Sequence, residues 1–237
     1  MLYRFSRRYF HSLLLTSVLS AADRLQETEG RWQILDTDGK VIDKPVLVSM
    51  PLIRDSQFAD VFDPGVQQEI RTKCFSFAKK SSGEFAAYIF TSIPPWNHAW
   101  VDWFRTQNVD SPGKQQYVQF LKETYRYSIG DVNKAYGIDS TSFTDLGQLD
   151  WNTAKLEGAT PRSDDKKFLG EIAETLFSLA AEAIRKADRT HFILGQQFSP
   201  NTPTEVIAAN AAIVRTQNVG RMASIDATAQ PLLLRSH

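Results

Sequence analysis

The sequence predicts an α/β fold in which buried strands alternate with amphipathic helices, as in a (β/α)8 TIM-type barrel, with only part of the barrel present. The first observation is the run Phe85 to Phe90, which is uncharged and apolar, as expected of a parallel strand buried on both faces. The second is the segment after it, where Pro94 and Pro95 lead into the tryptophan-rich stretch Trp96 to Trp103. In such barrels the loops after the strands build the active site. At 237 residues the chain is slightly shorter than the roughly 250 residues of a typical complete barrel.

Residues 1–22 leave two interpretations open. A basic start at residues 4–8, an apolar run at 13–19 and small residues up to Ala22 fit a secretory signal peptide, which would make the protein secreted or periplasmic. The apolar residues also recur at helical spacing and fit one face of an ordinary helix ending near Gly30, in a protein that stays in the cytoplasm. The rest of the chain, residues 23–237, is expected to form one partial barrel domain.

Three segments precede the central strand. Residues 31–40 alternate in polarity around an Asp-Gly turn and predict one arm of a hairpin. Val46 to Met50 predicts a second buried strand. Asp63 is expected to cap a helix whose first residue is Pro64, because an Asp side chain can accept from the free N–H groups of the first turn. We expect Val66, Ile70, Cys74 and Phe77 on the inward face of this helix.

The segments after the tryptophan-rich stretch continue the alternation. A helical insertion is expected over about residues 111–160. Ser163 is expected to cap a long amphipathic helix over 164–187, with Asp164 and Asp165 at its positive N-terminal end. His191 to Gly195 predicts the next buried strand. A further apolar helix begins at Thr202-Pro203, and residues 222–225 are the last candidate strand.

Composition argues against several partners. The 27 basic and 27 acidic residues cancel, so no electrostatic footprint for nucleic acid or an anionic membrane surface is expected. The apolar run near the N-terminus is too short to span a bilayer. The single cysteine cannot form an internal disulfide, and the four histidines offer no pair at short helical spacing, so neither a metal site nor a cofactor is expected.

The central segment also resembles a known family. Tyr88 to Trp96, with its Pro-Pro-Trp ending, is similar to strand four of retaining barrel glycosidases of the agarase and family 42 β-galactosidase type (clan A). In that family the strand ends in Asp-Asn-Glu, and here Thr91, Ser92 and Ile93 stand at those positions. The family's Glu is the general acid/base. The resemblance therefore implies both a barrel and the loss of its proton donor.

Two further strings support the resemblance. Asp60 to Pro64, DVFDP, is similar to the segment that follows strand three in the family. Residues 127–146 are similar to an insertion after strand four, with Asn133, Tyr136 and the turn from Ser142 to Leu146 as the matching positions. The resemblance implies that the chain covers about strands three to six with their helices. It also implies that the sequence ends before the strand that carries the family's nucleophile, a second Glu.

The candidate binding residues follow the two central strands. Trp96, Asn97, Trp100 and Trp103 come after the first, and indole faces stack well on apolar sugar faces. Gln197 follows Gly195 by two positions, where family members often carry an Arg, and its amide could bind sugar hydroxyls. The alternative is that the three tryptophans, at spacings of four and three, form the buried face of a helix.

No catalytic carboxylate can be assigned at the family's positions. A retaining glycosidase needs two carboxyl groups about 5 Å apart, and isoleucine can neither donate a proton nor attack. Asp102 is the one weak substitute in the tryptophan segment, provided that it folds back over the site.

Three functions remain open. The chain is a glycoside hydrolase-like protein with impaired catalysis, a carbohydrate-binding pseudoenzyme, or an active glycosidase with relocated carboxylates. The expected ligand is a galactan-type poly- or oligosaccharide. Exposed edges of a partial sheet would also favour pairing with another chain.

Overall fold

The computed structural model describes residues 23–28, 31–43, 45–53, 57–81, 85–151 and 159–219. After an N-terminal hairpin, the three strands of the central sheet are each followed by one or more helices, as expected of βα units. The two interpretations of residues 1–22 and the candidate strand at 222–225 lie outside the described residues.

The centre of the fold is a parallel sheet of three strands. β3 (Leu47–Pro51), β4 (Ala87–Thr91) and β5 (Phe192–Gln196) pair in the order β3-β4-β5. Leu47 lies opposite Ala87, and Ala87 opposite Phe192, so the strands begin nearly level. These are the three strands that the apolar runs predict, and each is followed by a helix. The structure confirms an α/β fold with a parallel sheet, whereas a complete barrel is not seen in the described residues.

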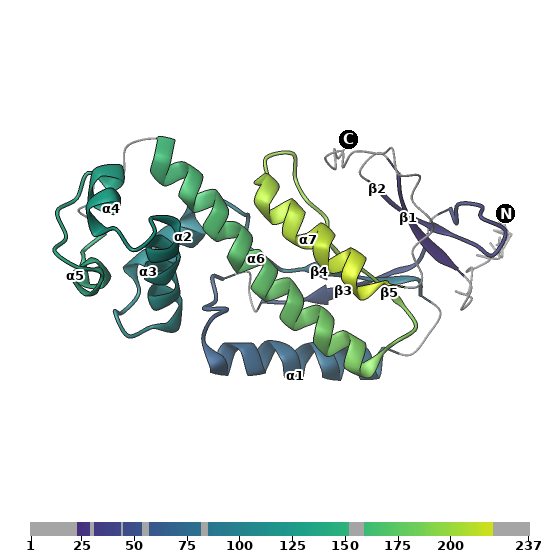
Figure 1. Ribbon diagram of the computed structural model, residues 1–237. Helices are drawn as coiled ribbons and strands as arrows, with labels where there is room; N and C mark the ends of the chain where they lie inside the picture. The colour runs from purple at the N-terminus through teal and green to yellow at the C-terminus, as the bar shows by residue number, and fades with distance from the viewer. Residues whose placement is uncertain are drawn as a thin grey trace, which may run out of the picture.

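Three long helices cover one face of this sheet. α6 (Ala159–Ala187) packs between α1 (Pro64–Lys80) and α7 (Thr204–Gln217), and the three lie side by side in Figure 1. The predicted inward face of α6 is confirmed, because its apolar residues are buried: Phe168, Ile172, Leu176, Leu179, Ala180, Ala183 and Ile184. Cys74 on α1 is also in the core, as predicted, and burial raises the pKa of its thiol to about 12. The thiolate is therefore absent at neutral pH.

Two aromatic side chains of β4 face these helices and not the interior of a barrel. The Phe90 ring lies 5.8 Å from the ring of Phe177 on α6, and the Tyr88 hydroxyl donates to Asp188 just beyond α6 (2.7 Å). Because alternate residues of a strand point to opposite faces, Ile89 and Thr91 take the other face instead, where both are half-buried.

The helix starts show one confirmed and one wrong prediction. The Asp63 carboxylate accepts from the backbone N–H of Val66 (3.0 Å), and Pro64 is the first residue of α1. α6, however, begins at Ala159, so Ser163 lies within the helix and does not cap it. Asp164 and Asp165 consequently lie beyond the first turn, where the helix dipole would not stabilise their charge. Both instead bind side chains of other segments.

Four shorter helices lie between β4 and α6. They are α2 (His98–Thr106), α3 (Pro112–Thr124), α4 (Ile129–Tyr136) and α5 (Phe143–Gln148), and they gather around the N-terminal end of α6 (Figure 1). The excursion thus begins before residue 111. Asn133 fixes the turn between α4 and α5, since its amide donates to Ser140 O (2.8 Å) and accepts from Ser140 N (3.1 Å). Ser142 caps α5 by accepting from Asp145 N (3.1 Å).

A hairpin lies near the N-terminal ends of the strands. β1 (Arg24–Thr28) pairs antiparallel with β2 (Arg31–Leu35), so a helix running to Gly30 is wrong for residues 24–28. The predicted arm at 31–40 is confirmed over β2, and Gly39 takes a positive φ of 79° in the turn that follows. The hairpin's Leu25 and Ile34 pack in one cluster with Ala87 and Phe192. It therefore covers the end of the sheet opposite the strands' carboxyl ends.

The outer edge of β5 is not free. Asn218 accepts from Ile193 N (3.1 Å) and donates to Ile193 O (2.9 Å), while Asn210 accepts from Gln196 N (2.9 Å). These two amides occupy backbone positions that a further strand would use. The prediction of two exposed edges is therefore wrong for β5, and within the described residues no strand pairs with the outer edge of β3.

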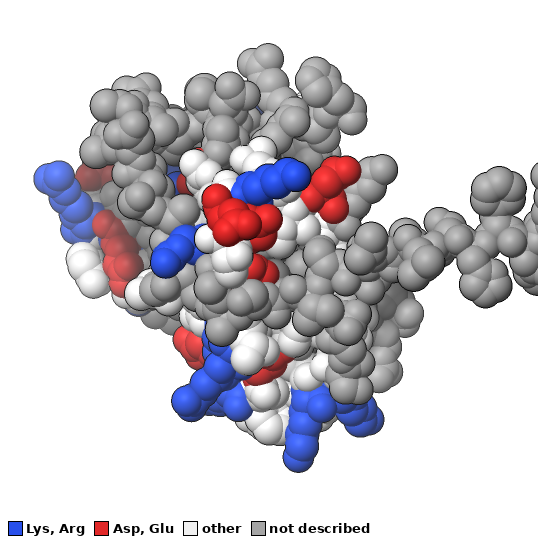
Figure 2. Space-filling model, turned by 90° about the vertical axis from the view of Figure 1, so that its right-hand side faces the viewer, with Lys and Arg blue, Asp and Glu red and all other residues white. Residues whose placement is uncertain are grey.

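The surface at the hairpin end carries both signs of charge. In Figure 2, Lys and Arg side chains alternate with Asp and Glu over this face without gathering into a patch of one sign. Among the described residues, no helix is both long and apolar enough to span a bilayer.

Candidate functional site

The carboxyl ends of β4 and β5 meet at one edge of the sheet, where the chain turns away from both strands. Thr91 ends β4, and Ser92 takes a positive φ of 57°, a conformation that is costly for a residue with a Cβ. Ile93 follows Ser92, is half-buried and packs against the core. The indole N–H of Trp96 then donates to Oε1 of Gln196, the last residue of β5 (2.8 Å). One hydrogen bond thus links the two strand ends.

The three tryptophans occupy different environments. Trp96 precedes α2 and stacks on Trp100, with ring centroids 5.1 Å apart and an angle of 13° between the rings. Trp100 is completely buried and contacts Phe58 on its other side, so both faces of its indole are occupied by protein. Trp103 is half-buried. Trp100 and Trp103 lie on α2, as the alternative of a buried helix face predicted, whereas Trp96 lies outside the helix. Because Trp100 is completely buried, its indole has no free face for a sugar.

A pocket of about 570 Å³ opens beside this edge of the sheet. Trp96, Asn97 and Asp102 line it on one side, and Arg162 and Lys166 of α6 and Asn201 of the loop before α7 line it on the other. Its walls therefore come from the segments directly after β4 and β5 and from the N-terminal part of α6. Barrels of this kind place their ligand sites at that end of the strands.

A buried guanidinium forms the floor of this pocket. Arg105 of α2 binds Asp102 (3.0 Å) through Nη1, and it contacts Asp165 of α6 through both Nη atoms. Its Nε and Nη2 donate to the Tyr117 hydroxyl at 2.9 and 2.7 Å. Two carboxylates thus share one nitrogen of the same arginine. They must lie close together, because each is within hydrogen-bond reach of Nη1.

Burial affects the pKa values of both Asp165 and Arg105. Burial raises the pKa of Asp165 above its ordinary 3.8, and the Arg105 charge opposes the rise. Burial would lower the pKa of Arg105, but the Tyr117 and Asp165 contacts outweigh it and hold that pKa above its ordinary value. The arginine therefore stays charged, while Asp165 is a buried carboxyl that takes up a proton more readily than an exposed one.

Tyrosines extend this network into the helical insertion. Asp164 accepts from the hydroxyls of Tyr125 (2.6 Å) and Tyr136 (3.2 Å), and Lys167 lies 3.3 Å from its other oxygen. Burial raises the pKa of Tyr117 to about 12, so it remains a neutral hydroxyl that can donate and accept. These bonds fix the insertion to α6 and so fix the wall of the pocket.

The predicted site residues are only partly brought together. Asn97 caps α2 by accepting from Ala99 N (2.9 Å) and also lines the pocket, and Asp102 lines it while paired with Arg105. Gln197 is exposed, and its neighbour Gln196 makes the contact with Trp96. Sequence reasoning missed Arg105 and Asp165 because their partnership spans sixty positions. No group of His, Cys, Asp and Glu suited to a metal ion occurs in the part of the chain that the structure describes.

Comparisons with known proteins bear on the fold. No protein-family model matches the sequence, and no curated protein matches it either. Among solved structures, PfGH50B aligns with a TM-score of 0.60 and 20% identity, covering 72% of this chain and 28% of that one. An exo-β-agarase aligns with a TM-score of 0.57 and 19% identity, over 72% of this chain and 26% of that one. The agarase AgWH50C aligns with a TM-score of 0.58 and 18% identity, over 72% and 27%.

These likenesses define the class of fold. The chain has part of the barrel fold found in agarase-type glycoside hydrolases, so the resemblance predicted from the Tyr88–Trp96 segment is confirmed at the level of the fold. The aligned part spans about a quarter of the length of each matched structure, between 26% and 28%.

Proposed function

We propose that this chain is a glycoside hydrolase-like protein whose ligand is a galactan-type oligo- or polysaccharide, bound where β4 and β5 end. The observation that carries the proposal is the pocket beside Trp96, which lies at the end of the strands where barrel enzymes of this fold bind their ligands. Of the predicted binding residues, Trp96 and Asn97 line this pocket and are the proposed contacts. Trp103 lines a separate groove with Phe58, and Gln197 lies outside the lining of the pocket. Trp100 supports the indole of Trp96 from behind.

We propose that catalysis is impaired, because an isoleucine stands where the resemblance places the family's general acid/base. Ile93 lies two residues after the end of β4, and its side chain packs against the core. Because this side chain is a hydrocarbon, it has no proton to donate. Removing a general acid typically lowers the rate by roughly 10² to 10⁴. The protein would then hold a saccharide with little or no hydrolysis.

One observation favours an active alternative. Asp102 and Asp165 share Nη1 of Arg105, both line the pocket with Trp96, and the pKa of Asp165 is raised by burial. Glycoside hydrolysis requires a pair of carboxyl groups, one of which donates a proton to the leaving group. In this alternative Asp165 is the proton donor and Asp102 is the second carboxylate.

Binding is tested by titrating the protein with galacto-oligosaccharides while tryptophan fluorescence is recorded. We expect saturable quenching that is lost in Trp96→Phe and kept in Trp32→Phe, because Trp32 lies in the hairpin at the other end of the sheet. Equal quenching in both variants would contradict the proposed place of the site.

Hydrolysis is tested with agarose and aryl β-galactosides on the parent chain, Ile93→Glu and Ile93→Gln. Loss of the acid predicts an inactive parent, and a gain in Ile93→Glu that Ile93→Gln lacks would show that a second carboxylate is in place. Activity in the parent that disappears in Asp102→Asn would support the alternative and overturn the claim of impaired catalysis. Activity that Asp102→Asn leaves unchanged would overturn both.

A further inference from the structure

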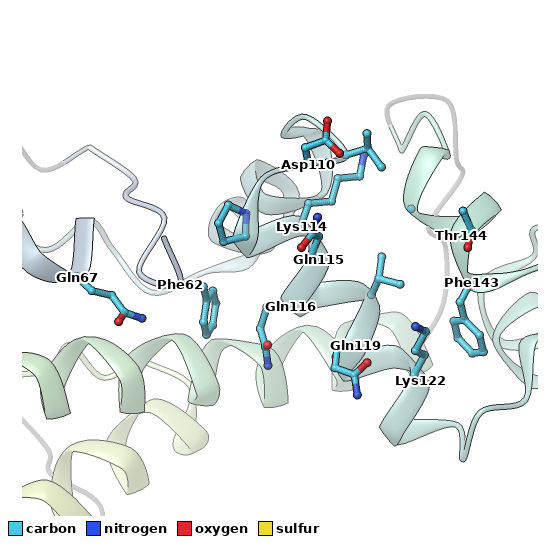
Figure 3. Close-up of a pocket in the computed structure, with 14 residues that line it drawn as sticks. Phe62, Gln67, Asp110, Lys114, Gln115, Gln116, Gln119, Lys122, Phe143 and Thr144 are labelled. Carbon is cyan, nitrogen blue, oxygen red and sulfur yellow. The ribbon is translucent and has the colours of Figure 1, made fainter. Parts of the chain in front are cut away.

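A second groove lies along α3, away from the site at the strand ends. It has a volume of about 740 Å³ and runs between α3, α5 and the segment before α1 (Figure 3). It shares no lining residue with the pocket beside Trp96. Its lining spans Pro112 to Lys122 of α3, about 15 Å at the rise of an α-helix, which is long enough for several sugar rings.

Primary amides dominate the polar lining of this groove. Gln115, Gln116 and Gln119 come from α3, and Gln67 faces them from α1 (Figure 3). Gln116 uses one N–H on Glu171 (3.4 Å), Gln119 uses one on Glu123 (2.6 Å), and Gln67 uses one on Val61 O (3.0 Å). Because a primary amide has two donors and an acceptor oxygen, each retains hydrogen-bonding capacity for a ligand. These three contacts also hold the amides in place.

An aromatic ring lies toward each end of the groove. Phe62 is held from behind by Phe104 and Phe168, whose centroids lie 5.7 and 5.9 Å away. Phe143 begins α5 and receives the ammonium group of Lys122 over its ring at 5.6 Å. Figure 3 places Phe62 near Gln67 and Phe143 near Lys122, with the α3 amides between them. Both rings are half-buried and fixed by neighbours.

The balance of charge decides the class of ligand. Lys114 is buried and interacts electrostatically with Asp150, and the ammonium group of Lys122 lies over the Phe143 ring. The acidic Asp110 lines the same groove. An anionic ligand would therefore find no uncommitted pair of cations here. An amphipathic peptide helix would need a continuous apolar stripe, and the lining is instead interrupted by amides.

From this lining we infer that the groove is a second binding site for a neutral oligosaccharide. Sugar hydroxyls both donate and accept, as primary amides do, and the apolar faces of sugar rings pack on aromatic rings. The inference rests on residues of the helical insertion together with Phe62 and Gln67 at the start of α1, and it goes beyond the proposed function. Such a site would hold a polysaccharide on the protein independently of the pocket at the strand ends.

The test is a titration of the isotope-labelled chain with neutral galacto-oligosaccharides, followed through the side-chain NH2 signals of glutamine. We expect saturable shifts, with an affinity that falls about thirtyfold in Gln115→Ala/Gln119→Ala and about fivefold in Phe143→Ala, since each lost contact is worth about 1 kcal/mol. Gln148→Ala is the matched control, because Gln148 is an exposed glutamine of α5 outside the lining. Thermal unfolding of each variant checks that it is folded.

Binding in this groove can be distinguished from binding in the pocket at the strand ends. No tryptophan lines the groove, so binding here shifts glutamine signals without quenching tryptophan fluorescence, and Trp96→Phe leaves it unchanged. The inference is overturned if neutral oligosaccharides cause no saturable shift, if the double variant binds like Gln148→Ala, or if only a sulfated oligosaccharide binds.

Discussion

The two ends of the β4–β5 pair each carry a carboxylate with hydrogen-bond partners, half-buried in Asp188 and buried in Asp165, but the two are held in different ways. At the end where the strands begin, Asp188 receives hydrogen bonds from the Tyr88 hydroxyl, the Thr190 backbone and the His191 ring (2.7, 2.8 and 2.6 Å). At the end where they finish, Asp165 meets one arginine that it shares with Asp102. The first carboxylate belongs to a closed, fully hydrogen-bonded end. The second lines an open pocket.

The pKa values record this difference. Burial would raise the pKa of Asp188, but its hydrogen bonds outweigh burial and hold it well below its usual 3.8. For Asp165 burial wins, and the pKa is raised. Ser92 with its positive φ and the buried, unpaired indole N–H of Trp100 also lie on the side of Asp165. Backbone strain often accompanies functional sites in proteins, but Arg126 and Tyr127 of the helical insertion also take positive φ, so strain does not single out this end.

The largest expected effect comes from removing the cation at the open end. Arg105→Met would leave Asp165 buried without its partner, and we expect the free energy of unfolding to fall by about 3–5 kcal/mol. Denaturant unfolding measures it, with Arg189→Met as the control because Arg189 is exposed. A loss no greater than in the control would mean that the network at this end contributes little stability.

A smaller loss is expected at the closed end. Tyr88→Phe removes one hydrogen bond to a charged carboxylate that keeps its other donors, so we expect a loss of about 1.5–3 kcal/mol. Tyr127→Phe is the matched control, since Tyr127 is 68% exposed. If Tyr88→Phe cost more than Arg105→Met, the ranking of the two ends would be reversed.

The pH dependence of stability should have opposite signs at the two ends. The folded pKa of Asp188 is lowered, so its contribution is present above 3.8 and is lost as the pH falls through the folded pKa. The folded pKa of Asp165 is raised, so ionising it above 3.8 costs stability, and this cost disappears in acid. We expect Asp188→Asn to flatten the loss of stability in acid and Asp165→Asn to steepen it. Unfolding curves collected from acidic to neutral pH measure how each variant changes the dependence of stability on pH. If both variants changed this dependence in the same direction, the opposite pKa shifts of Asp188 and Asp165 would be refuted.

The smallest effect is expected where the chain leaves β4. Ser92→Asn places a residue that tolerates positive φ at the strained position, and we expect stability to rise by roughly 0.5–1 kcal/mol. Ser92→Val, with a branched Cβ, should lower it. A thermal shift assay compares the three proteins, and an unchanged or lower melting temperature in Ser92→Asn would indicate that the conformation of Ser92 stores no strain.

The sequence by itself determined the local structure. Apolar runs such as Val46 to Met50 and Phe85 to Phe90 predicted the strands, and Asp63-Pro64 predicted the start of α1, because these signals depend on neighbours within a few residues. The Pro-Pro-Trp segment also predicted the class of fold that the solved structures support. The start of α6 was missed by five residues, because Ser163 is a good capping residue that tertiary packing placed inside a helix.

Only the tertiary structure decided which residues meet. It joined Trp96 to Gln196 and Arg105 to Asp165, and it turned Tyr88 and Phe90 toward the helices. It also covered the edge of β5 with Asn210 and Asn218. Such partners lie many residues apart along the chain, and their meeting depends on how helices pack on a sheet. No local pattern of residues records that geometry.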